Sequence, residues 1–263
     1  MAQHHSARCA RPGFRSSSAA LWADVGAAHG SRPLRRVELK ILLDPGQNFT
    51  EIAERLGMRA ATFSTGQLRY VDDADNTLSS RGLTVQIREF RRQVEFGVKL
   101  RADTPRRLSS AVRRLPGFSI ELDALPDRIQ WSASIKNSMK RPGKSLRLSG
   151  SWFDYCSPAQ RVFLASVTGS AGFPSYTTTF GPIQVDRLVG ESGVLARLML
   201  ERWTLPGGRE LLELSTKCRP GDAEQAVKSM RRVVQTHDLM PRSPQRTKTE
   251  VCLRAWASVA PAA

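Results

Sequence analysis

Apolar and polar residues alternate along several stretches of the chain, beginning with RRVELKILLDPG at residues 35–46. The apolar positions are Val37, Leu39, Ile41 and Leu43. Side chains two residues apart on a strand point the same way, so Glu38 and Lys40 share the opposite face of a strand over residues 36–43. Two structures explain this pattern: an antiparallel sheet with one face in water, and a barrel whose polar residues point inward and line a cavity.

The same alternation predicts further strands. Residues 83–89 and 94–101 alternate without a break, and Arg91-Arg92 between them predicts a hairpin. Shorter alternating stretches predict strands at residues 118–124, 181–188, 197–205, 208–217 and 246–256, with strand-like pieces in 127–150. The sum is seven to nine strands, each with one apolar and one polar face. Charges of both signs occupy the polar faces, including Glu121 and Asp123 in the strand at 118–124.

Helix signals interrupt the strands at three places. A helix is predicted to start at Asn48 or Thr50, and a second to start after Ser157 as N-cap, with proline at its first position. The clearest helix lies in residues 221–239, with Asp222 as cap and an apolar stripe at helical spacing. Strands interrupted by a few helices predict an α+β domain.

Residues 1–33 are rich in Ser, Ala, Gly, Arg and Pro and show no sustained period. They lack the apolar core of a secretory signal. We assign residues 1–33 to a disordered or spurious N-terminal extension, residues 34–256 to one domain and residues 257–263 to a C-terminal tail. Because the extension has no patterned apolar surface, its removal is expected to leave the melting temperature nearly unchanged.

The charge narrows the class of partner. The chain has 40 Lys and Arg against 24 Asp and Glu, a formal net charge of +16, which attracts polyanions such as phosphates, polyphosphate, nucleic acid or acidic membrane surfaces. A high-GC genome would also enrich arginine without selection for binding. No apolar run approaches the roughly 20 residues of a membrane-spanning helix, so we do not expect an integral membrane protein.

Cysteine and histidine usage restricts the chemistry. The four cysteines lie far apart without a C-x-x-C pair, so we expect reduced thiols in a cytoplasmic protein and no zinc knuckle. His237 is the one histidine outside residues 1–33, which argues against a histidine-based triad or a His-rich metal centre. Catalysis would have to use carboxylates, lysines and arginines.

The order of short motifs resembles that of the CYTH superfamily, the triphosphate tunnel metalloenzymes. That family opens with E-x-E-x-K, where this chain has RVELK, and continues with stretches similar to YVDDADNTLSSRGLTVQIR, GVKLR, LLELSTKCRPGD and RTKTEV. The matching positions are Glu38, Lys40, Tyr70, Asp72, Asp75, Leu78, Gly82, Arg88, Lys99, Glu213, Ser215, Gly221, Asp222 and Lys248. The resemblance covers roughly residues 35–256, in the correct order.

The resemblance implies a closed, eight-stranded antiparallel barrel with helices packed outside, which forms a triphosphate tunnel. Basic residues would grip the phosphates, with Lys40 and Arg88 also assigned to catalysis. The implied phosphate-binding residues are Lys40, Arg88, Lys99, Arg101, Lys217 and Lys248. The implied ligands of Mg or Mn are Glu38, Glu201 and Glu213, with Glu121 as a further carboxylate. We expect Lys40, Arg88, Lys99, Arg101 and Lys248 to point into one cavity.

Three positions depart from the family pattern. Arg36 replaces the first Glu of E-x-E-x-K, and Gln86 replaces the first Arg of R-x-R. Val251 replaces an Arg of the terminal motif. An arginine at the metal end of the tunnel would repel a divalent cation and could take its place as a fixed charge. The expected behaviour is phosphate binding that depends only weakly on Mg²⁺, with slow or no hydrolysis, and Arg36→Glu is expected to restore metal dependence.

Two functions follow from the resemblance. One is a metal-dependent hydrolase of inorganic, nucleoside or thiamine triphosphate, with adenylate cyclase as a rarer family activity. The other is a catalytically inert module that binds polyphosphate or another polyanion. A third hypothesis, based on charge alone, is an RNA-associated protein, and no nucleic-acid-binding motif supports it. Metal-dependent turnover of tripolyphosphate would separate the first two.

Overall fold

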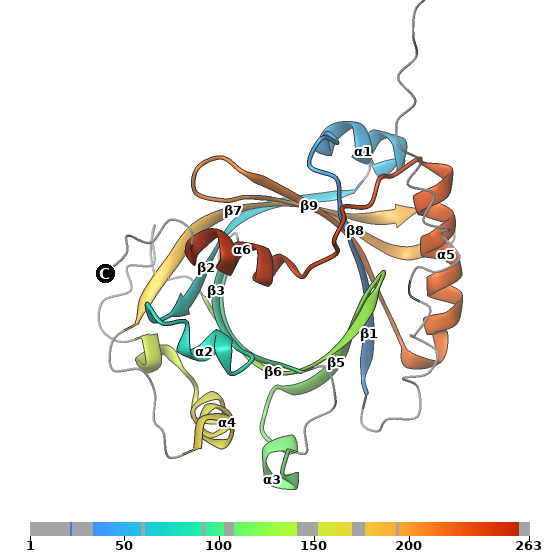
Figure 1. The fold of residues 1–263 in the computed structure, drawn as a ribbon. Helices are drawn as coiled ribbons and strands as arrows, with labels where there is room; N and C mark the ends of the chain where they lie inside the picture. The colour runs from blue at the N-terminus through green and yellow to red at the C-terminus, as the bar shows by residue number, and fades with distance from the viewer. Residues whose placement is uncertain are drawn as a thin grey trace, which may run out of the picture.

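Nine β-strands close into a barrel, and helices lie around it (Figure 1). The computed structural model describes residues 22, 34–58, 61–90, 93–102, 108–140, 152–169, 177–192 and 195–257. The strands are β1 (Arg36–Leu43), β2 (Thr62–Asp72), β3 (Leu83–Phe90), β4 (Gln93–Ala102), β5 (Phe118–Leu125), β6 (Arg128–Lys140), β7 (Thr178–Ser192), β8 (Leu195–Thr204) and β9 (Glu210–Cys218). The helices are α1 (Phe49–Arg55), α2 (Thr77–Ser80), α3 (Ser110–Arg113), α4 (Pro158–Thr168), α5 (Ala223–Thr236) and α6 (Lys248–Ala257), with 3-10 turns η3 (Trp152–Tyr155) and η5 (Pro220–Asp222).

The strands follow one another around the barrel in the order β1-β5-β6-β4-β3-β2-β7-β8-β9, and β9 pairs with β1. The closed barrel is confirmed, but it has nine strands rather than eight, and the β1–β5 pair is parallel. A parallel pair needs a long connection, which the chain between β1 and β5 supplies. The sequence pattern missed β2 because both of its faces are partly exposed along the first half.

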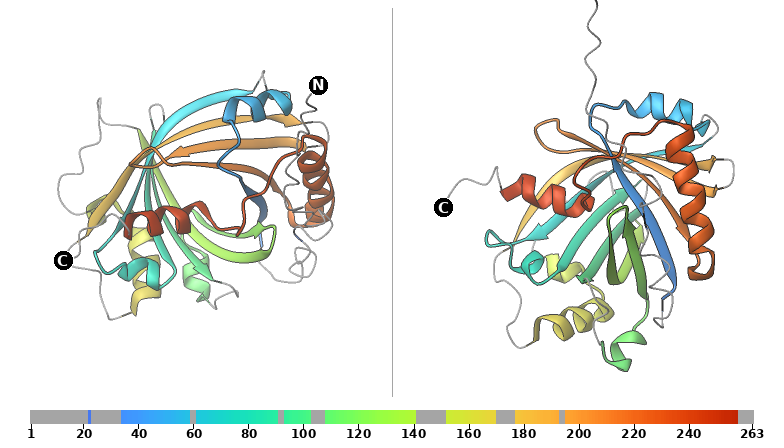
Figure 2. Two further views of the ribbon diagram at one scale, coloured as in Figure 1. Left: turned by 45° about the horizontal axis from the view of Figure 1, so that its top comes forward. Right: turned by 45° about the vertical axis from the view of Figure 1, so that its right-hand side comes forward.

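Helices lie against the outside of the barrel (Figure 2). Apolar side chains on the outer face of the strands pack against them. On β1, the four predicted apolar residues are buried in one cluster with the apolar stripe of α5 and with α1. A second cluster joins β3, β4 and β6 to α2, α3 and α4. Because these apolar rows face outward, the alternate polar rows of the same strands face the barrel interior.

Two of the three predicted helix starts have side-chain caps, whereas Asp222 occupies the N-cap position of α5 without a side-chain hydrogen bond. The Asn48 side chain accepts hydrogen bonds from the backbone N–H groups of Thr50 and Glu51 at the start of α1. Ser157 and Gln160 form a capping box at the start of α4. The hairpin between β3 and β4 is also present; its predicted turn, Arg91-Arg92, lies outside the described residues.

The strand predicted at residues 246–256 is wrong, because this segment contains helix α6. A capping box starts the helix: Thr247 N–H donates to Glu250 Oε2 at 2.8 Å, and Glu250 N–H donates to Thr247 Oγ1 at 3.2 Å. The T-x-x-E pattern was visible in the sequence and is a helix signal. Packing adds to it, since Val251 and Cys252 are buried and Trp256 stacks on Phe180 at 5.1 Å.

Helix α6 lies across one end of the barrel and covers an apolar part of its interior (Figures 1 and 2). The strands contribute Leu42, Leu68, Tyr70, Phe180, Ile183, Val185, Trp203 and Leu211 to this cluster, the β8–β9 turn contributes Leu205, and α6 contributes Val251 and Cys252. We call these residues the apolar floor. The barrel interior is therefore divided along its axis into an apolar end under α6 and a polar remainder.

Trp22 bears on the expectation that residues 1–33 can be removed with little change in the melting temperature, because it contacts the domain. Its side chain is buried in the core cluster of β1 and α5, and its indole N–H donates to the carbonyl of Ala124 at 2.9 Å. Its backbone N–H donates to the carbonyl of Pro126 at 2.8 Å. Deleting the whole segment would remove these contacts.

Two further expectations concern membrane-spanning helices and the state of the cysteines. No helix in the described parts of the chain is long and apolar enough to cross a membrane. Cys156, Cys218 and Cys252 are free thiols, and burial raises the pKa of Cys156 and Cys218 to about 11.

Candidate anion and metal site inside the barrel

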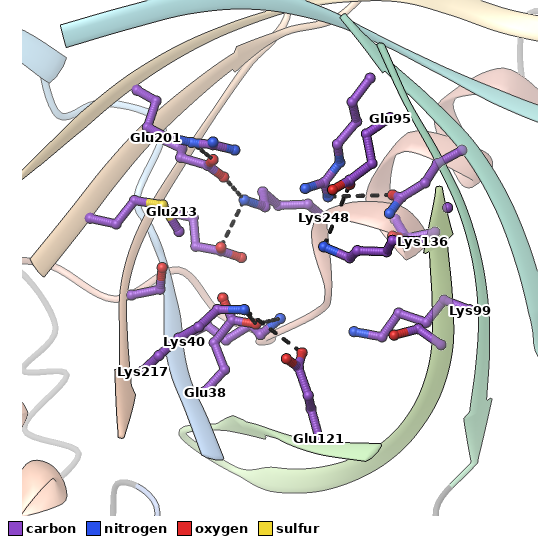
Figure 3. Close-up of a pocket in the computed structure, with 18 of the residues that line it drawn as sticks. Glu38, Lys40, Glu95, Lys99, Glu121, Lys136, Glu201, Glu213, Lys217 and Lys248 are labelled. Carbon is purple, nitrogen blue, oxygen red and sulfur yellow. Dashed lines mark hydrogen bonds and ion pairs between the residues drawn. The ribbon is translucent and has the colours of Figure 1, made fainter. Parts of the chain in front are cut away.

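A cavity of about 340 Å³ occupies the polar part of the barrel interior (Figure 3). Among the described residues, nine cations line it: Lys40, Arg88, Lys99, Arg101, Lys136, Arg187, Arg197, Lys217 and Lys248. Five carboxylates also line it: Glu38, Glu95, Glu121, Glu201 and Glu213. All six predicted phosphate-binding residues and all three predicted metal ligands therefore lie around one cavity. The alternation of apolar and polar residues on β1 is therefore that of a barrel with a polar interior, not that of a sheet with one solvent-exposed face.

One group of charges is built entirely from strands. Asp123 on β5 is fully buried, and its two oxygens lie 3.2 Å from Lys40 Nζ and 2.7 Å from Lys99 Nζ. Arg101 Nε is 3.9 Å away, and Lys40 also pairs with Glu38 at 3.0 Å. We call these five residues the strand cluster. Asp123 was noted as a polar-face residue but was not assigned to the site; its alternation with Glu121 on β5 was the available signal.

The pKa values in the strand cluster show which cation is least stabilised by the carboxylates around it. Burial opposes the charge on Glu38, but Lys40 and Lys217 outweigh it and lower its pKa to about 2. Burial likewise opposes the charge on Lys40, yet Asp123 and Glu38 raise its pKa. For Lys99, burial together with the nearby Arg101 and Lys40 outweighs the attraction of Asp123, so its pKa falls to about 8. The cluster is therefore short of negative charge at Lys99.

A second group of charges depends on helix α6. Glu201 on β8 and Glu213 on β9 are directly paired across the two strands. The ammonium group of Lys248 lies between the two carboxylates, ion-paired with Glu201 and 2.7 Å from Glu213 (Figure 3). Arg187 Nε binds the other oxygen of Glu201 at 2.6 Å. We call Arg187, Glu201, Glu213 and Lys248 the helix cluster.

The two carboxylates of the helix cluster differ in charge balance. Burial opposes the charge on Glu201, but Lys248 and Arg187 lower its pKa, and the Trp203 indole N–H donates to it at 3.2 Å. Burial raises the pKa of Glu213, with Glu201 and Glu38 adding to the effect against Lys248 and Lys40. Glu213 is therefore the carboxylate of this cavity that is short of positive charge.

The carboxylates that could hold a metal ion are grouped differently from the predicted set of Glu38, Glu201 and Glu213. Among the described residues, the three carboxylates with oxygens within 4.8 Å of one another are Glu38, Glu121 and Asp123. Glu201 and Glu213 instead hold the ammonium of Lys248. The Oδ1 atom of Asp123 is buried and accepts no hydrogen bond, although Lys40 lies near it. Three carboxylates suit Mg²⁺ or Mn²⁺ when phosphate oxygens and water complete the coordination, so the donor set fits such an ion.

Two further polar atoms of the cavity wall have no hydrogen-bond partner among the described residues. Arg101 Nε and Ser215 Oγ are both buried, and neither makes a hydrogen bond. Buried polar groups are paired in most proteins, so such atoms in a cavity wall call for an explanation, and a bound ligand is one. A phosphate oxygen could accept a hydrogen bond from either.

The three departures from the family pattern have different outcomes. Arg36 is exposed at the start of β1 and is not among the described residues that line the cavity, so the expectation that it takes the place of a metal ion is wrong. Among the inward-facing residues of β1, Glu38 is the first that is buried. Gln86 does line the cavity and accepts a hydrogen bond from Arg88 at 3.3 Å. Val251 belongs to the apolar floor.

Comparison with known proteins shows the fold. No protein-family model and no curated protein matches the chain. Among solved structures, a Hippeastrum protein proposed to be an adenylyl cyclase and described as having a dominant triphosphatase activity is similar, with a TM-score of 0.55 and 13% identity over 84% of this chain and 96% of the other. A Bacillus halodurans protein proposed to be an adenylate cyclase matches with a TM-score of 0.49 and 14% identity, over 83% of this chain and 97% of the other. The fold predicted from the motif order is thereby confirmed.

Proposed function

We propose that this chain, which has the fold of the CYTH proteins, binds a triphosphate group inside its barrel and hydrolyses it with the help of a divalent cation. The observation that carries the proposal is the convergence of nine cations, counted among the described residues, on one cavity inside the barrel. They outnumber the carboxylates there even when Asp123 is counted, so the cavity favours a compact ligand with several negative charges. Its volume is within the usual range for small-molecule sites.

The state of Lys99 supports an anionic ligand. A buried lysine with a lowered pKa gains from the arrival of negative charge, because the anion restores the stability of its ammonium form. Arg101 adjoins it with one unpaired donor, Nε. A phosphate group near Lys99 and Arg101 would satisfy both residues, and Lys40 would contribute its remaining donor capacity.

Hydrolysis of a triphosphate depends mainly on positioning and on stabilising the charge of the transferred phosphoryl group. Lys40 and Arg88 project from β1 and β3 on different sides of the cavity, and we assign to them this stabilising role. Strand-borne cations are held in place by the barrel, so little reorganisation accompanies the reaction. A Mg²⁺ or Mn²⁺ ion held by Glu38, Glu121 and Asp123 would supply further positive charge to phosphate oxygens.

A catalytically inert polyanion-binding protein is the second candidate. One observation favours it: every carboxylate of the proposed metal site already lies near an ammonium group. Lys40 pairs with Glu38 and Asp123, and Lys217 lies 3.7 Å from Glu121. If these lysines are not drawn away by phosphate, the carboxylates hold no metal ion and the cavity only binds.

Phosphate release separates the two candidates. We would incubate the protein with tripolyphosphate, ATP or thiamine triphosphate, with Mg²⁺, Mn²⁺ or a chelator. Turnover that stops with the chelator and in Lys40→Met, but persists in Lys228→Met on the outer surface of α5, supports the enzyme. Binding of tripolyphosphate without turnover supports the inert protein. Absence of binding would overturn the proposal as a whole.

A further inference from the structure

The loop that joins α5 to α6, residues 237–247, runs beside the end of β1. The Asp44 N–H donates to the carbonyl of Met240, and the Arg242 N–H donates to the carbonyl of Leu42, both at 2.8 Å. The loop can pair with β1 here because the pairing of β1 with β5 stops earlier along the strand. The backbone at Arg242 is therefore fixed against the wall of the barrel.

The turn between β8 and β9 lies at the same end of β1. β9 pairs with β1 so that Leu212 is opposite Leu43, and the turn comes directly before this part of β9. The Leu205 N–H donates to the carbonyl of Arg209 at 2.9 Å and closes the turn. Arg209 and Arg242 therefore lie on segments of chain that meet at one end of one strand.

Three guanidinium groups gather where the loop meets the turn: Arg209, which is exposed, and Arg242 and Arg246, which are half-buried. We call them the arginine cluster. Burial lowers the pKa of Arg242, and the charges of Arg209 and Arg246 lower it further, so the three cations are near one another. Among the described residues, no carboxylate forms an ion pair with any of them. Glu210, next to Arg209 in the chain, instead pairs with Arg202 at 3.8 Å.

The charge of the arginine cluster matches that of a phosphate group. Asp44 is the carboxylate that attracts Arg242, so three cations against one carboxylate leave two positive charges in excess. A phosphate group on a monoester carries about −1.5 to −2 charges near neutral pH, whereas a carboxylate carries a single charge. Guanidinium groups also bind phosphate oxygens in pairs, through parallel N–H donors. A phosphate between the three side chains would therefore balance their charge and remove their mutual repulsion.

We infer that Arg209, Arg242 and Arg246 form a second anion site, on the outer surface of the protein beside the start of α6, which binds one phosphate group. The ligand is orthophosphate or a phosphomonoester, because Arg209 is exposed and leaves room for an ester group in solvent. The site is separate from the cavity, since none of the three arginines is among the described residues that line it. Phosphate binding at this site goes beyond the proposed function and does not depend on hydrolysis inside the barrel.

The NMR signals of arginine side chains test the site directly. We would titrate orthophosphate, and separately glycerol 3-phosphate, into the protein at constant ionic strength and follow the Nε–H signals, each assigned through its loss in the corresponding glutamine variant. The signals of Arg209, Arg242 and Arg246 are expected to shift with one shared dissociation constant. A response to both ligands supports a site for phosphomonoesters, and a response to one of them alone supports a site restricted to that ligand. No shift of the three signals with either ligand, or three unrelated dissociation constants, would overturn the inference.

Single variants show whether the three side chains act together. Arg242→Gln, and separately Arg209→Gln on the exposed turn, remove one guanidinium group, and each is expected to weaken binding at the remaining signals about tenfold. Arg113→Gln removes the same charge from an exposed position of α3 and is expected to bind as the wild type does. Circular dichroism confirms that each variant is folded. Equal affinity in the folded cluster variants and in Arg113→Gln would overturn the inference, because net charge alone would then attract the phosphate.

Lys40→Met distinguishes this site from the cavity. The change removes a cation from the cavity and is expected to leave the dissociation constant at the arginine cluster unchanged. If the three shifts disappear in this folded variant, the signals report a ligand in the cavity, so the inference is wrong and the proposed function stands. If tripolyphosphate does not bind to the protein but orthophosphate still shifts the three signals, the proposed function is wrong and the outer site stands.

Discussion

The strand cluster and the helix cluster lie in the same cavity, but their buried charges are neutralised in different ways. In the strand cluster, Asp123 receives its cations from β1 and β4, so every partner belongs to the barrel wall. In the helix cluster, the ammonium between Glu201 and Glu213 comes from α6, which is held by its own capping box and apolar contacts. The first arrangement is fixed by the closure of the barrel, whereas the second depends on the docking of one helix.

The two clusters differ in which charge a ligand would stabilise. Burial lowers the pKa of Lys99 in the strand cluster, which would gain from added negative charge, and raises the pKa of Glu213 in the helix cluster, which would gain from added positive charge. An incoming phosphate would therefore be stabilised most beside Lys99. The two clusters are therefore not equivalent halves of one site. The following experiments test this difference between them.

The largest effect is expected from Asp123→Ala. This change removes the carboxylate shared by Lys40 and Lys99 and leaves two buried ammonium groups with too little negative charge. The expected loss in the free energy of unfolding is about 3–5 kcal/mol, measured by denaturant unfolding. Asp127→Ala, on an exposed residue of the same β-hairpin, is the control and should change stability by about 0.5 kcal/mol or less. A small loss in Asp123→Ala would mean that the strand cluster does not need its central anion.

Lys248→Met is expected to cost less, about 1–3 kcal/mol at neutral pH, because Arg187 still pairs with Glu201 and α6 keeps its apolar contacts. The pKa of Glu213 is already raised in the folded state, and loss of Lys248 raises it further. A carboxyl group with a raised pKa favours the folded state more as pH falls, because the folded state then binds more protons than the unfolded one. Lys248 also lowers the pKa of Glu201, but that part of the wild-type advantage is lost only as the pH falls below 4.5, the ordinary pKa of the group, and so does not change between pH 7 and pH 5.

The difference in stability between wild type and Lys248→Met should therefore shrink between pH 7 and pH 5 in paired unfolding experiments. A difference that stays constant over this range would show that Lys248 does not control the charge of Glu213.

Glu38→Gln and Glu213→Gln are a matched pair of changes for locating a metal ion. Mn²⁺ binding in the presence of tripolyphosphate, followed by electron paramagnetic resonance, should weaken at least about tenfold in Glu38→Gln. It should change little in Glu213→Gln, because Lys248 already lies between the two carboxylates of the helix cluster. The reverse ranking would assign the ion to the helix cluster and displace Lys248 from it.

The smallest expected signal is a proton taken up on binding. At pH 8 to 9 the Lys99 side chain is partly neutral, since its pKa is about 8, and a bound phosphate would raise that pKa. Calorimetry in two buffers of different ionisation enthalpy should therefore show uptake of a fraction of one proton per tripolyphosphate. Lys99→Arg keeps the positive charge without titrating in this range, and uptake that persists in this variant would assign the proton to another group.

Local patterns in the sequence predicted the barrel wall well. Alternation on β1, β3, β4 and β9 indicates which residues face inward, because a strand repeats every two residues. Alternation put Lys40, Arg88, Lys99 and Lys217 on the polar faces of their strands, and the family resemblance implied the cavity that they line. The strand predicted at residues 246–256 failed because its alternation was read without the capping box at Thr247.

The grouping of carboxylates could not be read from local patterns. Glu38 meets Asp123 through the register of the parallel β1–β5 pair, which joins segments far apart in the chain. Lys248 meets Glu201 and Glu213 because α6 crosses the end of the barrel, and no spacing within α6 specifies that position. Burial of Trp22 likewise depends on a surface formed by the folded domain.

The affinity of tripolyphosphate for three proteins tests the central claim most directly. The wild type, Lys40→Met and Lys228→Met would be titrated by calorimetry at one pH and one salt concentration. Lys40 lies in the cavity and Lys228 on the outer surface of α5, so both changes alter the net charge equally. The account predicts one tripolyphosphate per wild-type molecule, binding at least about tenfold weaker in Lys40→Met, and unchanged binding in Lys228→Met. Equal affinities in all three proteins, or no binding to the wild type, would contradict it.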